Sequence, residues 1–564
     1  MSNPVFEAKE KLYALITKAL HDAMDAGDLP VCEEPPAFVV EIPADTSHGD
    51  FATNAAMVGA RAFHAAPRKI AQALCDHLDL DGSGFDRVEI AGPGFINFFL
   101  GRQWFSGVVN EVLQAGENYG RTDYGKGEKI QVEFVSANPT GPMHMGNARG
   151  GAIGDCLAAA LDWAGYAVSR EFYVNDAGNQ IEKFANSLQA RYLQIYKGED
   201  AVPVPEDGYH GDDIRQRAQE FAEIHGDKYL DADETERKHA LVGYALPQNI
   251  EKLKTDLARY RITYDVWFLE SSLHHGAIDD VIKLLSSRGM TYEKDGALWY
   301  KATENGGEKD EVLVRANGFP TYFAADIAYH YNKFAVRGFD RVINVWGADH
   351  HGHVARLKGA MDAIGLDGSK LDIVLMQLVR LMKDGQPYKM SKRTGKAISL
   401  TDLLEDVSVD AARFFFNMRE PNSPVDFDLD LAVEQSSQNP VYYVQYAHAR
   451  ICSVLRKLQE QGVCPRSCTT AELDGMDSAV ETELIRTLAR FPLEIIEAAK
   501  NYDPARLTKY AVEVANGFHK FYDKCPIKDA AEPLMQARLN LCLAVKTVLC
   551  NLLTLLKITV PESM

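Results

Sequence analysis

One segment near residue 130 constrains the fold more than any other part of the 564-residue chain. An apolar run at 130–135 passes through a Gly- and Pro-containing stretch at 136–142 into an Ala- and Gly-rich helical segment at 148–163. A second apolar run at 168–174 and a helical pattern at 181–196 follow. Strand, helix, strand and helix in this order predict the opening of a parallel α/β sheet.

The same alternation returns after residue 303. Further strands are predicted at 311–315, 341–346 and 371–376, with helices at 322–334 and 353–364. The polar, mostly helical pattern between the two halves predicts an insertion. The sequence therefore predicts an α/β fold with a Rossmann-type parallel-sheet catalytic domain over 116–400, which holds an inserted, mostly helical subdomain at about 197–303.

A chain of this length exceeds one hydrophobic core, so flanking domains are expected. Helix and strand patterns alternate over short distances in residues 1–115 and predict a compact N-terminal α/β module, with one of its helices at 50–64. Past residue 400 the strand patterns stop. A connecting helical segment is predicted at 401–438, and an all-α bundle at 439–564.

Composition narrows the class of protein. The N-terminus lacks the basic stretch and apolar run of a signal peptide, and the longest apolar run, at 539–545, predicts a core helix rather than a membrane span. Nine scattered cysteines supply no zinc set and indicate reduced thiols in a cytoplasmic protein. The net charge of −20 argues against a nucleic-acid partner, because phosphate contacts need Lys and Arg. This charge is an average over the whole surface, however, and acidic and basic residues nearly balance from residue 439 onward.

The turn after the first strand carries residues suited to phosphate. Gly141-Pro142-Met143-His144-Met145-Gly146-Asn147 opens the helix, and a helix N-terminus offers free N–H groups and the positive end of a dipole. His144 and Asn147 lie three positions apart, so both side chains can face one ligand, and Gly146 lets a nucleotide approach the backbone. The alternative is a helix start with incidental polar residues.

A second segment far downstream is basic. Lys389-Met390-Ser391-Lys392-Arg393 lies within a Gly- and Lys-rich loop at 384–396. Its lysines could stabilise charge on a leaving pyrophosphate, and Ser391 could donate a hydrogen bond. A basic loop by itself is usually only solvated surface, but its combination with the upstream turn favours activation of a carboxylate by ATP.

These two segments resemble the signature sequences of class I aminoacyl-tRNA synthetases. Longer stretches resemble the arginyl family, at 133–142, 319–329, 345–352, 439–450 and 561–564. The likeness spans nearly the whole chain and is weakest in the acidic insertion. Asn147 replaces the family's histidine, which keeps a hydrogen-bond donor but removes any cationic role, and Arg393 replaces the commoner serine.

The resemblance implies an ATP site, with Mg²⁺ accompanying ATP. It assigns catalysis to His144, Asn147, Lys389 and Lys392. It assigns ATP binding to Pro142, His144, Gly146, Asn147, Gly347, Asp349, His350, Lys389, Met390, Ser391 and Lys392. The three histidines at 350–353 also invite a metal interpretation, but no Cys or carboxylate set accompanies them, so no metal site is expected.

For an arginine substrate, the pocket needs carboxylates and a flat group, because a guanidinium is planar, always charged and offers five donors. The resemblance implies arginine binding by Glu133, Ser136, Asn138, Tyr322, Asp326 and His350. Tyr322 and Asp326 lie four apart on one helical face. Asp326 is the expected guanidinium partner, and Tyr322 a lining residue. An ordinary amphipathic helix is the alternative for this pair.

The turn at Asn175 and Asp176 is a weaker site candidate, which capping of the next helix explains equally well. In the C-terminal bundle, Tyr442, Tyr446 and Arg450 combine aromatic rings with a cation, as suits splayed single-stranded bases. Tyrosines at helical spacing are more often core residues. The resemblance implies that this bundle binds the tRNA anticodon and that the N-terminal module contacts the tRNA elbow.

The resemblance as a whole implies an arginine–tRNA ligase activity in a cytoplasmic monomer without a membrane partner. Its partners would be L-arginine, ATP and tRNA(Arg), charged through the 2′-hydroxyl of the terminal adenosine, with activation dependent on bound tRNA. A cysteinyl synthetase would need a zinc set. A small-molecule nucleotidyltransferase would leave both end domains unexplained, and a non-catalytic tRNA-binding relative would not need Lys389 and Lys392.

Overall fold

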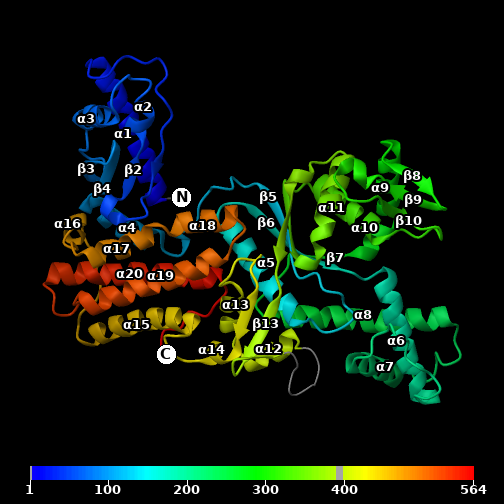
Figure 1. Cartoon of the computed structure of the whole chain (residues 1–564). Coiled ribbons are helices and arrows are strands. Elements are labelled where there is room, and N and C mark those ends of the chain that lie inside the picture. Colours follow the sequence, from blue (N-terminus) through cyan, green and yellow to red (C-terminus); the bar gives the residue numbers. More distant parts are fainter. Residues whose placement is uncertain (1–2, 389–397) are drawn as a thin grey trace.

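A five-stranded parallel sheet forms the centre of the computed structural model, which describes residues 3–388 and 398–564. Its order is β12-β11-β5-β6-β7, and every neighbouring pair is parallel. The strands are β5 (Lys129–Glu133), β6 (Ala167–Val174), β7 (Val266–Leu269), β11 (Arg341–Gly347) and β12 (Leu371–Met376). The predicted Rossmann-type sheet is confirmed, and Figure 1 shows it between the N-terminal and inserted parts.

Helix α5 (Met145–Trp163) lies directly against the sheet, because its glycines let the two backbones approach closely. A Cβ atom at Gly154 would overlap the Phe134 ring, and one at Gly151 would lie 2.7 Å from the Ile262 side chain. Nearly every residue of the helix from Ala148 onward is buried. The close fit fixes the N-terminus of α5 at the carboxyl end of β5.

The inserted subdomain has a core of its own. Helices α6 (Gly178–Lys197), α7 (Asp212–His225) and α8 (Glu234–Arg259) enclose it. Strand β7 falls within the predicted range of 197–303 but pairs with β6 in the central sheet, so that range is not one continuous insertion. The four apolar residues of β7 were not predicted as a strand, because helical patterns surround them in the sequence.

A small antiparallel sheet follows β7. It contains β8 (Thr291–Lys294), β9 (Ala297–Tyr300) and β10 (Glu311–Val314), with α9 (Ala277–Ser287) beside β8. The prediction that 311–315 belongs to the central sheet is wrong, because β10 pairs with its antiparallel neighbour β9, where Glu311 lies opposite Tyr300. After it come α10 (Tyr322–Tyr331), a π-helical turn η5 (Asn332–Val336) and α11 (His351–Ala363).

The N-terminal module is a separate α/β layer at one end of the molecule (Figure 1). It comprises α1 (Pro4–Asp25), β1 (Val40–Glu41), β2 (Phe51–Thr53), α2 (Ala55–Gly59), α3 (Pro67–His77), β3 (Phe85–Ala91) and β4 (Phe95–Leu100). The predicted helix at 50–64 begins instead with β2, which pairs with β4. Cross-strand pairing overrides the helical pattern there.

The C-terminal part is a helical bundle, as predicted. Its helices are α15 (Pro440–Glu460), α16 (Thr470–Leu473), α17 (Ala479–Ala489), α18 (Phe491–Lys500), α19 (Ala505–Lys524) and α20 (Glu532–Leu555), and α4 (Arg102–Ala115) packs against α17 and α20. Before it lie β13 (Val379–Lys383), β14 (Gln386–Pro387), α12 (Leu400–Asp406), α13 (Val409–Phe416), β15 (Val425–Asp428) and α14 (Leu429–Val433). The prediction that 401–438 is a helical segment without strands is wrong in part, because β15 pairs in parallel with β13, which is distant in sequence.

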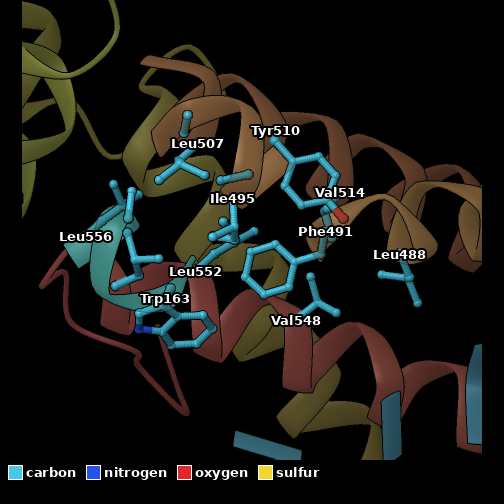
Figure 2. Close-up of a cluster of buried hydrophobic side chains, with 14 of the residues drawn as sticks. Trp163, Leu488, Phe491, Ile495, Leu507, Tyr510, Val514, Val548, Leu552 and Leu556 are labelled. Atoms are coloured by element: carbon cyan, nitrogen blue, oxygen red, sulfur yellow. The ribbon is translucent and has the colours of Figure 1, made fainter. Parts of the chain in front are cut away.

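Helix α20 is more apolar than the run at 539–545 indicated. In the described part of the chain, it alone is long and apolar enough by composition to span a membrane, with a mean hydropathy of 1.4. Of the 18-residue stretch of α20 that has this mean hydropathy, 67% is buried inside the protein. Figure 2 shows Val548, Leu552 and Leu556 packed with Phe491 and with Trp163 of α5, so the helix forms the bundle core.

A buried carboxylate ties α5 to the bundle. Asp155 is fully buried and accepts from Arg413 Nη2 at 2.6 Å and from Lys557 Nζ at 2.8 Å. Arg170 Nε lies 3.7 Å from the same carboxylate. Arg413 also donates to the Leu556 carbonyl at 2.8 Å, so one charged cluster joins the catalytic domain to the end of α20.

We expect Asp155→Asn to lower the free energy of unfolding by about 3 kcal/mol or more, because it leaves buried cations without their counter-charge. The measurement is the thermal and urea unfolding of purified protein. Asp426→Asn is the control, since the Arg380–Asp426 pair is exposed and is worth about 1 kcal/mol at most. Equal stability of the two variants would contradict the role assigned to Asp155.

Candidate active site

The chain leaves β5 through a strained turn, residues 134–144, which we call the phosphate turn. Val135 (φ 70°) and Ser136 (φ 43°) both adopt left-handed backbone conformations that side chains disfavour. The Ser136 hydroxyl donates to Glu133 Oε1 at 2.9 Å and accepts the Tyr173 N–H at 3.1 Å. These bonds hold the strained backbone between β5 and β6.

The start of α5 is capped by its own motif. The Asn147 side-chain oxygen accepts the His144 backbone N–H at 3.1 Å, and the Asn147 N–H donates to the His144 carbonyl at 2.9 Å. This leaves the amide nitrogen of Asn147 to donate outward. Pro142, His144 and Gly146 are exposed, and a Cβ atom at Gly146 would meet no atom within 4 Å. The helix N-terminus is therefore open to a ligand.

The residues that follow the downstream basic segment, 398–400, lie beside this turn. Lys389, Met390, Ser391, Lys392 and Arg393 lie outside the described residues. The segment that follows them pairs with the start of α5: Met145 N–H donates to the Ile398 carbonyl at 3.2 Å, and Leu400 N–H to the Met143 carbonyl at 2.9 Å. Residues 398–400 therefore lie against a turn about 250 positions upstream in the sequence.

Glu133 is part of a buried charged network. Its Oε2 lies 2.6 Å from Lys333 Nζ, which also donates to Asn344 Oδ1 at 3.1 Å. Register puts Glu133 directly opposite Asn344 on β11, and the π-helical turn directs Lys333 toward both. Burial lowers the pKa of Lys333, and the adjacent Glu133 carboxylate opposes that shift.

Asp326 is held by a chain of side chains from α11 and β10. His353 Nε2 lies 2.8 Å from Asp326 Oδ2, while His353 Nδ1 accepts from Arg356 Nε at 2.6 Å. Because a guanidinium only donates, His353 carries its proton on Nε2 and donates it to Asp326. Arg356 is itself paired with Glu311 at 2.6 Å. The carboxylate of Asp326 is fixed in place yet 35% exposed.

Sequence reasoning missed a third carboxylate, Glu270. It is 3% exposed, directly follows β7, and accepts a hydrogen bond from the Tyr173 hydroxyl. Burial raises the pKa of Glu270, and the nearby Asp326 raises it further. Its position at the carboxyl end of an apolar strand was the available signal. Burial and the charges of Glu270, Asp326 and Glu133 raise the pKa of Tyr173, so the three carboxylates surround this phenol.

The turn at 175–176 positions Glu270 rather than capping α6. Asp176 accepts from the backbone N–H and the hydroxyl of Ser271, at 2.8 and 2.6 Å. The Asn175 amide, oriented toward its acceptors, donates to Glu270 Oε2 at 2.8 Å. The N-cap of α6 is Ala177 without a side-chain cap, so the capping interpretation is wrong.

The remaining predicted site residues within the described ranges are mostly exposed. Asn138, Asp349 and His350 are exposed, and Gly347 ends β11. Tyr322 is 41% exposed at the first turn of α10, with its ring 3.4 Å from where a Cβ atom of Gly178 would be. In the described ranges 3–388 and 398–564, no group of three or more His, Cys, Asp or Glu side chains is arranged to hold a metal ion.

The three candidates in the bundle line one cavity of about 410 Å³. Tyr442, Tyr446 and Arg450 share it with Ser437, Tyr443, His519 and Asp523. The Tyr446 ring lies 6.4 Å from the parallel Tyr442 ring and 5.9 Å from His519. Burial and the Arg450 charge lower the pKa of His519, so this ring is neutral near pH 7.

Known proteins resemble this chain over its whole length. The chain matches the family model "tRNA synthetases class I (R), catalytic domain" over residues 108–452, the arginyl tRNA synthetase N-terminal domain over 10–100 and the DALR anticodon binding domain over 444–564. It is 58% identical to the arginine–tRNA ligase of Caldanaerobacter subterraneus subsp. tengcongensis and 53% identical to that of Ruminiclostridium cellulolyticum, with all of each chain covered.

The chain belongs to the arginyl-tRNA synthetase family. Its fold matches the solved arginyl-tRNA synthetase of Thermus thermophilus with a TM-score of 0.72, covering 97% of this chain and 99% of that one at 23% identity. The resemblance drawn from the two signature segments is confirmed at the level of the family. The strained turn, the buried Lys333–Glu133 pair and the cluster around Glu270 are therefore features of an arginyl-tRNA synthetase.

We expect Lys333→Met to lower the free energy of unfolding by about 3–5 kcal/mol, because it leaves Glu133 buried without a counter-charge. The double variant Lys333→Met/Glu133→Gln removes both charges and should recover most of that loss. Urea unfolding of both variants measures the effect. A single variant as stable as the unmodified protein would show that the pair is not a buried ion pair.

Proposed function

We propose that the chain activates L-arginine with ATP and transfers the arginyl group to the 3′-terminal adenosine of tRNA(Arg), releasing AMP and diphosphate. It acts as an arginine–tRNA ligase. The observation that carries this conclusion is the junction of the phosphate turn with residues 398–400, beside a pocket of fixed carboxylates. An ATP motif alone would not select a substrate, but these carboxylates select a cation.

The charge of the pocket fits arginine. Lys333 compensates Glu133, whereas Glu270 and Asp326 are paired with histidines, His274 at 3.5 Å and His353 at 2.8 Å, and not with a lysine or arginine in the described cluster. Arginine has a guanidinium and an α-ammonium group, and a guanidinium prefers planar, bidentate carboxylate contacts. We assign Asp326 and Glu270 to the guanidinium and Tyr322 to the pocket wall. Glu133, Ser136 and Asn138 lie toward the α-amino and carboxylate ends.

The activation step needs positioning more than covalent help. The arginine carboxylate attacks the α-phosphate of ATP, the bond to the β-phosphate oxygen breaks, and diphosphate leaves. The open N-terminus of α5, with His144 and Asn147, would receive the phosphates. Lys389, Ser391 and Lys392 would stabilise the leaving diphosphate. Gly347, Asp349 and His350 would border the adenosine, and Mg²⁺ would enter bound to ATP.

The bundle cavity supports recognition of tRNA. Its parallel rings and Arg450 provide stacking faces and a cation for unpaired bases. The neutral His519 adds a third flat surface. We assign this cavity to an anticodon-loop base, with Tyr446 as its stacking partner. A cytoplasmic monomer without a membrane partner remains the expectation for the whole protein.

An aminoacylation assay of total tRNA with each of the twenty amino acids tests the proposed activity. We expect arginine alone to be charged, with formation of AMP. ATP–pyrophosphate exchange with arginine should stay near background until tRNA is added. Charging of another amino acid, or none, would overturn the assignment of substrate.

Glu270→Gln tests the guanidinium site and the cost of burying a carboxylate. Loss of a desolvated charge partner should lower kcat/KM for arginine by roughly 10²–10³-fold. The surface variant Glu293→Gln should leave it unchanged. The kinetic assignment fails if Glu270→Gln retains near-normal kcat/KM.

The same variant has an expected pH signature. The raised pKa of Glu270 means that the folded protein holds its proton more tightly than the unfolded chain, so this stability is lost as pH rises through the folded pKa. Glutamine stays neutral. Glu270→Gln should therefore melt at a higher temperature than the unmodified protein at neutral pH, and this difference should vanish below the ordinary glutamate pKa of about 4.5. Thermal melts across pH measure it.

Tyr446→Ala tests the bundle cavity. Loss of one base stack, about 1–3 kcal/mol, should raise KM for tRNA by roughly 10-fold while KM for arginine and ATP stay unchanged. Tyr446→Phe keeps the ring and should retain tRNA affinity. An unchanged KM for tRNA in the alanine variant would remove Tyr446 from tRNA recognition.

A further inference from the structure

Two helices of the inserted subdomain reach the phosphate turn. On α8, the Asn249 amide nitrogen donates to the Pro139 carbonyl at 3.0 Å. On α7, Asp213 lies near Gly141, where an added Cβ atom would be 3.7 Å from Asp213 Oδ2. Pro142 and Asn249 also line a cavity of about 240 Å³ between the turn and these helices. The subdomain is therefore in direct contact with the segment that precedes the ATP site.

The orientation of the Asn249 amide is fixed by Arg217. Arg217 Nε donates to Asn249 Oδ1 at 3.0 Å, and its Nη1 donates to Glu220 Oε2 at 2.7 Å. A guanidinium can only donate, so the amide oxygen of Asn249 must face Arg217. The amide NH₂ group then faces the turn, as a donor to the Pro139 carbonyl.

This bond supports the middle of the turn from outside. The two ends of the turn are held by other segments, since the Tyr264 hydroxyl donates to the Phe134 carbonyl at 3.0 Å and the Leu400 N–H to the Met143 carbonyl at 2.9 Å. The preceding residues, Val135 and Ser136, hold strained backbone conformations. Strained backbone keeps its shape only where its surroundings constrain it.

Asn249 also lies where α8 passes from one core to another. Leu241 and Ala245 pack in the core of the inserted subdomain, whereas Leu253 and Leu257 pack in the core of the catalytic domain. Pro247 lies inside the helix between these two pairs and cannot donate a backbone hydrogen bond there. Because Asn249 lies at this junction and contacts the turn, a shift of the subdomain would also shift the turn.

We propose that Asn249 is a positioning residue for ATP: through Arg217 and Asn249, the inserted subdomain holds the Pro139 carbonyl and thereby the phosphate turn. The inference rests on the proposed use of ATP at this turn. Asn249 does not touch the reacting atoms, and its side chain is half-exposed beside the cavity. Its substitution therefore leaves both hydrophobic cores intact.

Asn249→Asp separates positioning from folding in the full-length protein. The aspartate keeps an acceptor for Arg217 but cannot donate to Pro139, and it puts a carboxylate oxygen against that carbonyl. We expect kcat/KM for ATP in aminoacylation to fall on the order of 10-fold, mainly through KM. KM for arginine and the melting temperature should stay unchanged, since Glu270 and Asp326 are held by other contacts.

Lys238→Gln is the matched control, because it removes ion pairs to Glu182 and Glu234 within the same subdomain, away from the turn. It should leave KM for ATP unchanged. An unchanged KM for ATP in Asn249→Asp overturns the proposal. An equal rise in KM for arginine, together with a lower melting temperature, also overturns it. Absence of arginine charging by the unmodified protein would refute the proposed function instead.

Discussion

The close packing of α5 on β5 is the constraint on which the structure depends. Gly154 permits it, because any side chain there would overlap Phe134. The helix then presents three functional positions from one rigid element. Its N-terminus is open to a ligand, Asp155 accepts from Arg413 of α13 and from Lys557 after α20, and Trp163 enters the bundle core (Figure 2). Movement of the bundle relative to the sheet would disturb the same helix that opens the proposed ATP site.

The amino-acid pocket illustrates how charge can be buried and still remain available. Lys333 neutralises Glu133 inside the sheet, and hydrogen bonds from His353, Tyr173 and Asn175 orient the other two carboxylates without cancelling their charge. Burial raises the pKa of the Glu270 carboxyl, so its ionised form is costly in the folded protein. A cationic substrate at the proposed site would remove that cost, so binding and selectivity would have the same physical origin.

Much of the fold followed from local pattern, and the failures have definite causes. Apolar runs followed by turn residues identified β5, β6, β11 and β12, because buried parallel strands are continuous apolar stretches. Short strands such as Val266–Leu269 and Phe51–Thr53 were missed, since only their ladder partners distinguish them from helical or irregular segments. Glu270 was missed together with β7, and the partners of Asp176 and Glu133 depended on residues distant in sequence.

The sequence by itself determined the chemistry that is available: a helix start suited to phosphate, a basic segment, and acidic and aromatic residues at helical spacing. Local propensity and short-range spacing encode these features within a few residues. Only the tertiary structure decided which charges are paired and which face a ligand, because ion pairs such as Lys333–Glu133 and contacts such as Asn249–Pro139 join residues over 100 positions apart. Burial and dielectric environment arise from that assembly, and no local pattern contains them.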